Sequence, residues 1–339
     1  MKKLRIVSLI LLIVGIVLLV GVMVLFSLGR INFGNFFRVE KQVEIFSKTE
    51  SMTGINEISL DLASADIRIV PSDVEEVTVT YKGPESKKDD PDITVEVKDG
   101  ELKVMQEKTN FFYLFSWNFT QRLVEIEIPE SYAGELSVLN SSGNLTIDGD
   151  YTFASYYSNV TSGDISIDRM STADFVLSST SGNIKIGTLK TDKFDIRVTS
   201  GDTNVDELTG DGTLKTTSGN VVILILNGRA DLTTSSGNST VREWKGSGSM
   251  HCASGNLEVF ISESTGDMTI GTTSGNIKVS LSEKAAYQIE ASVVSGDINS
   301  DIPLTYTGNN KNDAHGDFGT DPANSLTVKA TSGNIRIAA

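Results

Sequence analysis

Apolar and polar residues alternate through the second half of the chain in short runs that recur at a nearly constant spacing. Most of these runs follow a Ser-Gly-Asn or Ser-Gly-Asp triplet, and ten such triplets occur between residues 142 and 334. Eight of the nine intervals between their glycines are 18 to 21 residues long, and the ninth is 37. A fixed period of this length is typical of a solenoid, in which each unit buries its apolar face only by stacking on its neighbours.

The alternation within one repeat predicts two strands that flank the triplet. In the repeat around Gly182, Leu177 precedes the triplet, and Ile184 and Ile186 follow it on either side of a polar residue. Apolar residues at every second position indicate a strand with one buried face. We therefore expect an all-β fold, a parallel β-solenoid (β-helix) whose turns each contain a strand, a corner, a second strand and a looser return. Cys252 falls on an inward position of this pattern.

The triplet glycines are predicted to form the corners of the coil, because glycine adopts the positive φ angles that tight bends require. They are Gly143, Gly163, Gly182, Gly201, Gly219, Gly237, Gly255, Gly275, Gly296 and Gly333. Stacked turns lie about 4.8 Å apart, so the Asn side chains after the glycines should form a hydrogen-bonded ladder. Asp164, Asp202 and Asp297 replace Asn without being neighbours, as expected if adjacent carboxylates repel. Calcium is the alternative, but it takes several carboxylates and each corner offers at most one.

The N-terminal residues predict a membrane anchor. Residues 6–28 carry no charge and exceed the roughly 20 residues that cross a bilayer. Lys2, Lys3 and Arg5 precede them, so the positive-inside rule predicts a cytoplasmic tip at 1–5 and an extracytoplasmic C-terminal domain. A cleaved signal peptide is the alternative, but its apolar core is shorter and ends in a small-residue cleavage site. We expect a single-pass signal anchor, followed by a juxtamembrane linker at 29–54.

Residues 55–130 are expected to form a β-rich N-terminal cap on the solenoid, which occupies residues 131–339. Ser64-Ala65-Asp66 resembles a degenerate corner of the same kind. The aromatic run inside this cap contains Phe111, Phe112, Tyr113, Phe115, Trp117 and Phe119. These six residues are candidates for contact with the membrane interface or a protein partner, because Trp and Tyr suit boundaries between apolar and wet surroundings. A buried lid over the open end of the coil is the alternative.

An insertion at 303–325 doubles the last interval. It is predicted to leave one final turn, residues 326–337, which closes the stack. Asp313, His315, Asp317 and Asp321 in the insertion could gather around a cation, but polar loops of this kind are more often plain insertions. We therefore predict no metal site and no cofactor.

The composition argues against several classes of function. The net charge of −15 disfavours nucleic-acid binding, because the phosphate backbone attracts basic proteins. A single cysteine permits no intrachain disulfide, and the chain has two histidines and none of the common hydrolase or phosphate-binding motifs. The outward acids of the repeats, such as Asp148, Asp168, Asp206, Glu243 and Glu258, are scattered among different registers, and nothing marks two of them as an acid and base pair. We predict no catalytic residues and no enzyme.

A polysaccharide-binding or polysaccharide-cleaving β-helix protein is the alternative function. Binding of an extended glycan would favour a row of aromatic side chains along one flat face. The repeats contain Tyr151, Tyr156, Tyr157 and Trp244, which form no clear row.

The repeat pattern Leu-x-x-x-Ser-Gly-Asn/Asp-Ile-x-Ile, the copy at Ser64-Ala65-Asp66, the strand ending at Ile128-Pro129 and the late insertion together resemble one family over residues 55 to 337. It is the bacterial putative-adhesin domain family, also described as domain of unknown function 4097, which includes LiaG-like membrane-anchored envelope proteins. The resemblance implies a non-enzymatic protein of the cell envelope, in some members associated with envelope stress. It implies no ligand or catalytic residue. The expected partners are the membrane itself, a membrane protein or an envelope glycan.

Overall fold

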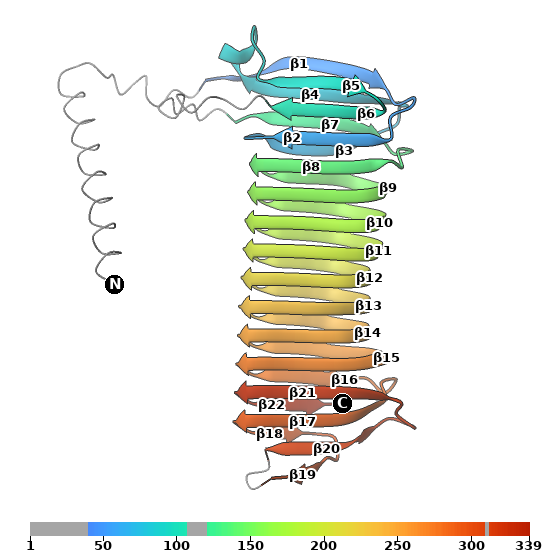
Figure 1. Ribbon diagram of the computed structural model, residues 1–339, viewed down its shortest axis with the longest axis vertical. Coiled ribbons are helices and arrows are strands. Elements are labelled where there is room, and N and C mark those ends of the chain that lie inside the picture. Colours follow the sequence, from blue (N-terminus) through green and yellow to red (C-terminus); the bar gives the residue numbers. More distant parts are fainter. Residues whose placement is uncertain (1–39, 107–120, 309–311) are drawn as a thin grey trace, which may run out of the picture.

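The computed structural model describes residues 40–106, 121–308 and 312–339. In this part of the chain, turns of strand are stacked along a rod, with the N-terminal strands at one end and the C-terminal strands at the other (Figure 1). The predicted all-β fold with a parallel, solenoid-like stack is therefore confirmed. No helix among these residues is long and apolar enough to cross a membrane. The expected tip at 1–5 and the anchor at 6–28 lie outside the described residues.

The strands fall into an N-terminal group, a central stack and a C-terminal group. The N-terminal group consists of β1 (Gln42–Ser51), β2 (Glu57–Leu62), β3 (Asp66–Ser72), β4 (Glu76–Pro84), the short 3-10 helix η1 (Glu85–Lys87), β5 (Ile93–Lys98), β6 (Glu101–Gln106) and β7 (Leu123–Pro129). The central stack consists of β8 (Glu135–Ser142), β9 (Leu145–Ser162), β10 (Ile165–Ser181), β11 (Ile184–Ser200), β12 (Thr203–Ser218), β13 (Val221–Ser236), β14 (Ser239–Ser254), β15 (Leu257–Ser274) and β16 (Ile277–Leu281). The C-terminal group consists of β17 (Tyr287–Ser295), β18 (Ile298–Ser300), β19 (Thr305–Thr307), β20 (Asp313–Phe318), β21 (Asn324–Ser332) and β22 (Ile335–Ala338).

Each strand from β9 to β15 runs through most of a turn and bends twice on the way. In β10, buried residues alternate with outward ones, and two consecutive outward residues interrupt the alternation at Asp168-Arg169 and again at Ala173-Asp174. The stretch between these bends buries Met170 and Thr172. The prediction of a looser return was therefore wrong, because this stretch also contributes side chains to the core and pairs with its neighbours.

The parallel register places similar side chains on top of one another inside the rod. Ile165 lies beside Ile184, and Phe175 beside Phe194. The buried apolar residues form one cluster, and each fully buried aliphatic side chain contributes about 1.5–3 kcal/mol. Cys252 is buried in this core. Stability is thus built up turn by turn, as expected for a solenoid.

The ten triplet glycines lie at corners where only glycine fits. Their φ angles are between 126° and 147°, a region that residues with a Cβ rarely adopt. A Cβ atom would also overlap the backbone of the adjacent turn. At Gly219, for example, it would meet the carbonyl oxygen of Gly201. Two independent constraints, backbone angle and close stacking, therefore require glycine at each corner.

The residue after each glycine builds a ladder along the rod. Its side-chain Oδ1 accepts a hydrogen bond from the backbone N–H of the equivalent residue in the next turn, at 2.7–3.1 Å. In stacking order the ladder runs through Asp66, Asn144, Asp164, Asn183, Asp202, Asn220, Asn238, Asn256, Asn276, Asn334 and Asp297. The four carboxylates in it are separated by Asn in every case. The predicted ladder exists, but its donors are backbone amides, apart from one further bond from Asn220 Nδ2 to Asp202 Oδ1.

The N-terminal strands add one turn and then close the stack. β2 pairs with β8 and β3 with β9, both in parallel, so the degenerate copy around Ala65 is a turn of the rod. β6 and β7 continue beside them in parallel, whereas β5, β4 and β1 pair antiparallel at the end. Residues 42–51 of the expected linker 29–54 therefore form strand β1. The change of strand direction ends the parallel stacking, which suits a cap.

The C-terminal end differs from the predicted order. β21 pairs with β15 on one side and with β17 on the other, and β22 lies between β16 and β18. The final turn therefore sits between the turns of Gly275 and Gly296, and the prediction that it closes the stack was wrong. The insertion supplies the actual end, because its strand β20 pairs antiparallel with β17 and with β19. Asp267 in β15 links this strand to β21, because its Oδ1 accepts hydrogen bonds from the backbone N–H and the Oγ of Ser325. These hydrogen bonds lower the pKa of Asp267.

Candidate functional site

Two columns of outward side chains run along one face of the rod, on the strand segment that follows each corner. The parallel register lines up the first column, which contains Lys185, Asn204, Val222, Thr240, Glu258 and Lys278. The second column stands two positions later in each strand and contains Gly187, Asp206, Leu224, Arg242, Phe260 and Ser280. The register of β14 and β15 shifts after Val241, so Arg242 and Glu243 together lie opposite Phe260. We refer to this surface as the two-column face.

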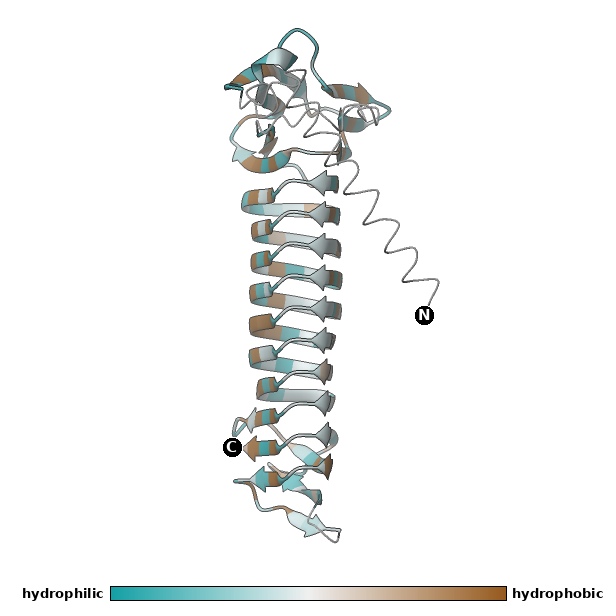
Figure 2. Cartoon of the chain, turned by 90° about the vertical axis from the view of Figure 1, so that its left-hand side faces the viewer, coloured by the Kyte–Doolittle hydropathy of each residue, from teal (hydrophilic) through white to brown (hydrophobic). Residues whose placement is uncertain are grey.

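The middle of the two-column face is apolar. The second column holds Asp148, Asp168 and Asp206 in earlier turns but Leu224 in β13. Leu224 and Ile225 each expose 37% of their surface. In Figure 2 this turn is brown along a stretch where the neighbouring turns alternate between brown and teal. Leu224 and Ile225 are adjacent, so together they form a small apolar patch, unlike the isolated exposed side chains elsewhere on the described surface, such as Val74 and Val294.

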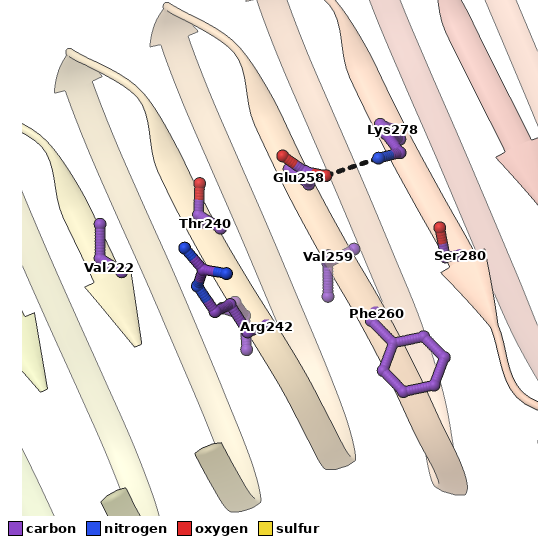
Figure 3. Close-up of a pocket in the computed structure, with 9 residues that line it drawn as sticks. Val222, Thr240, Arg242, Glu258, Val259, Phe260, Lys278 and Ser280 are labelled. Carbon is purple, nitrogen blue, oxygen red and sulfur yellow. Dashed lines mark hydrogen bonds and ion pairs between the residues drawn. The ribbon is translucent and has the colours of Figure 1, made fainter. Parts of the chain in front are cut away.

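A shallow groove of roughly 470 Å³ lies on this face from β13 to β16. Arg242 and Phe260 stand along one side of it, and Thr240, Glu258 and Lys278 along the other (Figure 3). The Phe260 ring is half-buried, so one part of it remains available to a partner. The groove is open and shaped to receive an extended or flat surface, in contrast to the enclosed pockets that hold small molecules.

The charges of the two-column face are only partly neutralised within the chain. Glu258 Oε1 and Lys278 Nζ form an ion pair of 2.7 Å between neighbouring turns. Among the described residues, the side chains of Lys185, Asp206 and Arg242 have no ion-pair partner. A guanidinium presents a fork of donors that matches a carboxylate. Arg242, which stands between Leu224 and Phe260, is therefore suited to a carboxylate of a partner.

On the strand segment after the two columns, Lys245 and Glu263 form an ion pair between neighbouring turns. Lys245 Nζ lies 2.7 Å from Glu263 Oε2. The hydrogen bond from Lys245, together with its charge, lowers the pKa of Glu263. Arg242 lies three residues before Lys245 on the same strand and lacks such a partner. Arg242 is thus available to a charged partner, as are other lysines and arginines on the described surface that form no ion pair, such as Lys215 and Arg229.

The two-column face contains none of the predicted site residues that the structure describes. The aromatic run Phe111, Phe112, Tyr113, Phe115, Trp117 and Phe119 is outside the described residues. In the insertion, Asp313, His315 and Asp317 lie on β20 and Asp321 in the turn after it. Within the described ranges no three His, Cys, Asp or Glu side chains are grouped so that they could hold a metal ion.

The outward acids are more ordered than predicted. Asp148, Asp168 and Asp206 share the second column, so the prediction of different registers was wrong for these three. Asp148 is occupied by an ion pair with Arg68, whose Nε lies 2.7 Å from its Oδ2. Each of the three acids stands four residues after the Asn or Asp of its triplet, so the repeat spacing alone was sufficient to place them in one column.

The family profile described as Toastrack DUF4097 matches residues 55–224 and 226–338. The chain belongs to the Toastrack DUF4097 family. The resemblance inferred from the repeats is therefore confirmed. No curated protein matches this Toastrack chain.

The Toastrack chain is also similar to solved bacterial structures. A putative adhesin from Parabacteroides distasonis ATCC 8503 shares 14% identity with a TM-score of 0.42, over 88% of this chain and 98% of the other. A putative lipid binding protein from the same organism shares 13% identity with a TM-score of 0.38, over 88% and 99%. A putative adhesin from Parabacteroides merdae ATCC 43184 shares 15% identity with a TM-score of 0.38, over 89% and 98%.

Reasoning from the Toastrack sequence missed the two-column face. Of the four aromatic residues considered for a glycan-binding row, Tyr151, Tyr156 and Trp244 are buried, and Tyr157 is 41% exposed. Phe260, which stands on the two-column face, was not among them. A signal was present, however, in the six consecutive aliphatic residues from Val221 to Leu226. Unbroken apolar sequence in a strand that should alternate predicts an outward apolar patch.

Proposed function

We propose that this Toastrack protein is a non-enzymatic, adhesin-like module of the cell envelope, anchored in the membrane by residues 6–28, which binds a partner outside the cell through its two-column face. The observation that carries the proposal is the exposure of Leu224 one turn before Arg242, which forms no ion pair within the described chain and lines the groove together with Phe260. Phe and Arg are enriched at protein interfaces, and Arg is also frequent at binding hot spots.

The position of the face along the rod supports this proposal. Strand β1, which contains the first described strand residues, lies at one end of the rod (Figure 1). From the turn of β3, the stack passes through β9, β10, β11 and β12 before it reaches β13. At about 4.8 Å per turn this is about 24 Å. An anchor at the N-terminal end would thus hold the apolar patch clear of the bilayer.

The non-enzymatic part of the proposal is supported by the shape of the groove. Reaction centres are usually concave pockets in which several polar groups converge on one point. Here the side chains stand in two parallel columns, and the acid Glu258 is ion-paired with Lys278. The arrangement is suited to holding a partner along a surface.

The test is attachment of the full chain to envelope fragments of the source cells. Leu224→Asp combined with Phe260→Ser should reduce attachment by roughly tenfold or more, because it places a charge and a void in the apolar patch. Val294→Asp is the matched control, since Val294 is 79% exposed on the terminal turn and lies outside the face. Thermal unfolding of each variant checks that the rod is intact.

Attachment that the face variant leaves unchanged would overturn the proposed site. Loss of attachment in Phe115→Ala alone would instead assign binding to the aromatic run. Turnover of an envelope polysaccharide by the full chain would overturn the non-enzymatic part of the proposal.

A further inference from the structure

We infer that the partner of the two-column face is a second copy of this chain, packed face to face with its rod antiparallel; the inference rests on the proposed binding role of this face. Most protein pairs of identical chains are related by a two-fold axis. We place the two-fold axis between the two faces, parallel to the strands and level with β13. Under this rotation, each column of one chain lies opposite the same column of the second chain. The rotation also places each turn before β13 opposite the turn equally far after it.

The charges of the face match under this operation. Asp206 lies one turn before Leu224 and Arg242 one turn after it, so each Asp206 meets the Arg242 of the second copy. In the first column, Lys185 lies two turns before Val222 and Glu258 two turns after it, so these also meet with opposite charges. The axis repeats both pairings. The side chains of Lys185, Asp206 and Arg242, which lack ion-pair partners within the described chain, would thereby all acquire one.

The shapes match as well. Leu224 and Val222 each meet their own copy at the axis and form the apolar centre of the interface. Gly187 lies two turns before the centre and Phe260 two turns after it. The half-buried Phe260 ring would therefore stand over a position with no side chain. A central apolar cluster surrounded by polar pairs is the usual anatomy of a specific interface.

The same residues disfavour a centre on either neighbouring turn, and a centre between turns would leave Asp206 or Arg242 opposite Leu224 without an ion pair. A centre one turn earlier would put Asp206 against its own copy, and a centre one turn later would do so with Arg242. Like charges in direct contact cost several kcal/mol and exclude both alternatives. With the centre at β13, Glu207 and Glu243 oppose each other with like charge, but they stand at the bend after the two columns.

The size of the face permits a weak, specific dimer. The corner ladder passes through eleven turns. At about 4.8 Å per turn the strip is about 50 Å long and, with two side chains across it, about 12 Å wide, so the pair would bury on the order of 1,200 Å² in total. This is the lower limit for specific interfaces, so the dimer should be reversible.

Antiparallel packing also restricts where the dimer can form. The N-terminal ends of the two rods, where the proposed anchors join, point in opposite directions. Two copies anchored in one bilayer point the same way and cannot adopt this arrangement. Copies on two facing membranes can, which makes the interaction adhesive.

The experiment is sedimentation of the full chain in detergent micelles, with Asp206→Arg, Arg242→Asp, their double variant and an equimolar mixture of the two single variants. Each single variant opposes like charges at both ends of the apolar centre and should weaken the dimer by roughly tenfold or more. The double variant should dimerise again. The mixture should form heterodimers, because the arginine introduced at position 206 would meet the aspartate introduced at position 242 only between the two different variants. Both positions are outward and lack ion pairs, so the rod itself should remain folded.

The outcomes separate this inference from the proposed function. Rescue in the mixture supports the homodimer. A wild-type chain that stays monomeric up to about 100 µM, a range that covers weak specific complexes, would overturn it. So would single variants that dimerise normally or a mixture that stays monomeric. If the single variants lose attachment to envelope fragments from cells that lack this protein, the face binds a different molecule. The proposed function then stands while the homodimer falls.

Discussion

At the scale of single residues, the corner explains why Asn and Asp are interchangeable after glycine. The ladder uses only the side-chain Oδ1 as an acceptor, and both residues have this atom. Asn220 Oδ1, for example, accepts from the N–H of Asn238 at 3.0 Å, and Asp202 Oδ1 accepts from the N–H of Asn220 at 2.8 Å. Either Asn or Asp can therefore occupy a corner, provided that two Asp residues do not stand in adjacent turns.

The effect of a new carboxylate in the ladder should depend on its neighbours. Asn220→Asp places two carboxylates in adjacent turns, beside Asp202, and removes the bond from Asn220 Nδ2 to Asp202 Oδ1. We expect a loss of about 1–2 kcal/mol in the free energy of unfolding at pH 7 and low salt. Asn256→Asp is the control, because Asn238 and Asn276 on either side are neutral. It should change stability by less than about 0.5 kcal/mol.

Chemical denaturation at pH 7 and pH 4 measures this difference. Protonation removes the repulsion, so the deficit of Asn220→Asp should shrink as the pH falls through the range in which carboxylates titrate. Equal losses in both variants would show that the ladder depends on the Asn amide and not on the Oδ1 acceptor.

At the scale of strands, the buried tyrosines make the rod sensitive to alkali. Tyr287 in β17 is fully buried, and its hydroxyl has no hydrogen-bond partner among the described residues. Burial, and secondarily the charge of Asp267, raises the pKa of Tyr287 to about 12. The neutral phenol is therefore favoured in the folded chain. Its contribution to stability is complete below about pH 10, where an unfolded tyrosine titrates, and is lost as the pH rises towards 12.

Tyr287→Phe should therefore retain the stability of the parent chain at pH 7 and lose less of it above pH 10. The substitution keeps the ring and removes an unpaired buried hydroxyl. Unfolding midpoints between pH 8 and pH 12 measure the difference, with the exposed Tyr157→Phe as the control. Identical alkaline loss in the parent and in Tyr287→Phe would contradict this account.

The elements also show where inference from sequence succeeds. Strands β9 to β15 stack in chain order, so the spacing of Gly163, Gly182 and their successors was sufficient to predict them. β21 carries the same motif, yet it lies beside β15, because after an insertion a strand can join whichever edge is free. The residues from Leu326 to Ile337 contain no local signal that shows which strand β21 will pair with. The apolar patch was readable at Leu224, where alternation fails, but its pairing with Phe260 required the register.

At the scale of the whole molecule, strands β21 and β22 form an internal layer of the rod, although they come last in the described chain. A chain that ends at residue 323 lacks β21 and β22, which separate β15 and β16 from β17 and β18. We expect this truncation to expose everything after β16 to hydrogen exchange, because β17 and β20 lose the layer on which they pack. Strands β9 to β13 should keep their protection.

Removal of Ala338 and Ala339 alone is the control, since it leaves the corner of Gly333 in place. Hydrogen exchange with mass spectrometry distinguishes the two chains. If β17 stays protected from hydrogen exchange in the chain that ends at residue 323, β17 can stack directly on β15.

The position of β21 and β22 has a consequence for the order in which the protein is made. A nascent chain emerges N-terminus first, and turns up to β15 can stack as each one leaves the ribosome or the translocation channel. β17 cannot take its final place until β21 and β22 have emerged, since they form its neighbouring layer on the rod. This end of the rod therefore assembles only after residues 324–338 have been made. A chain released too early would keep an exposed strand edge on β15, which quality-control proteases and other unfinished chains can recognise.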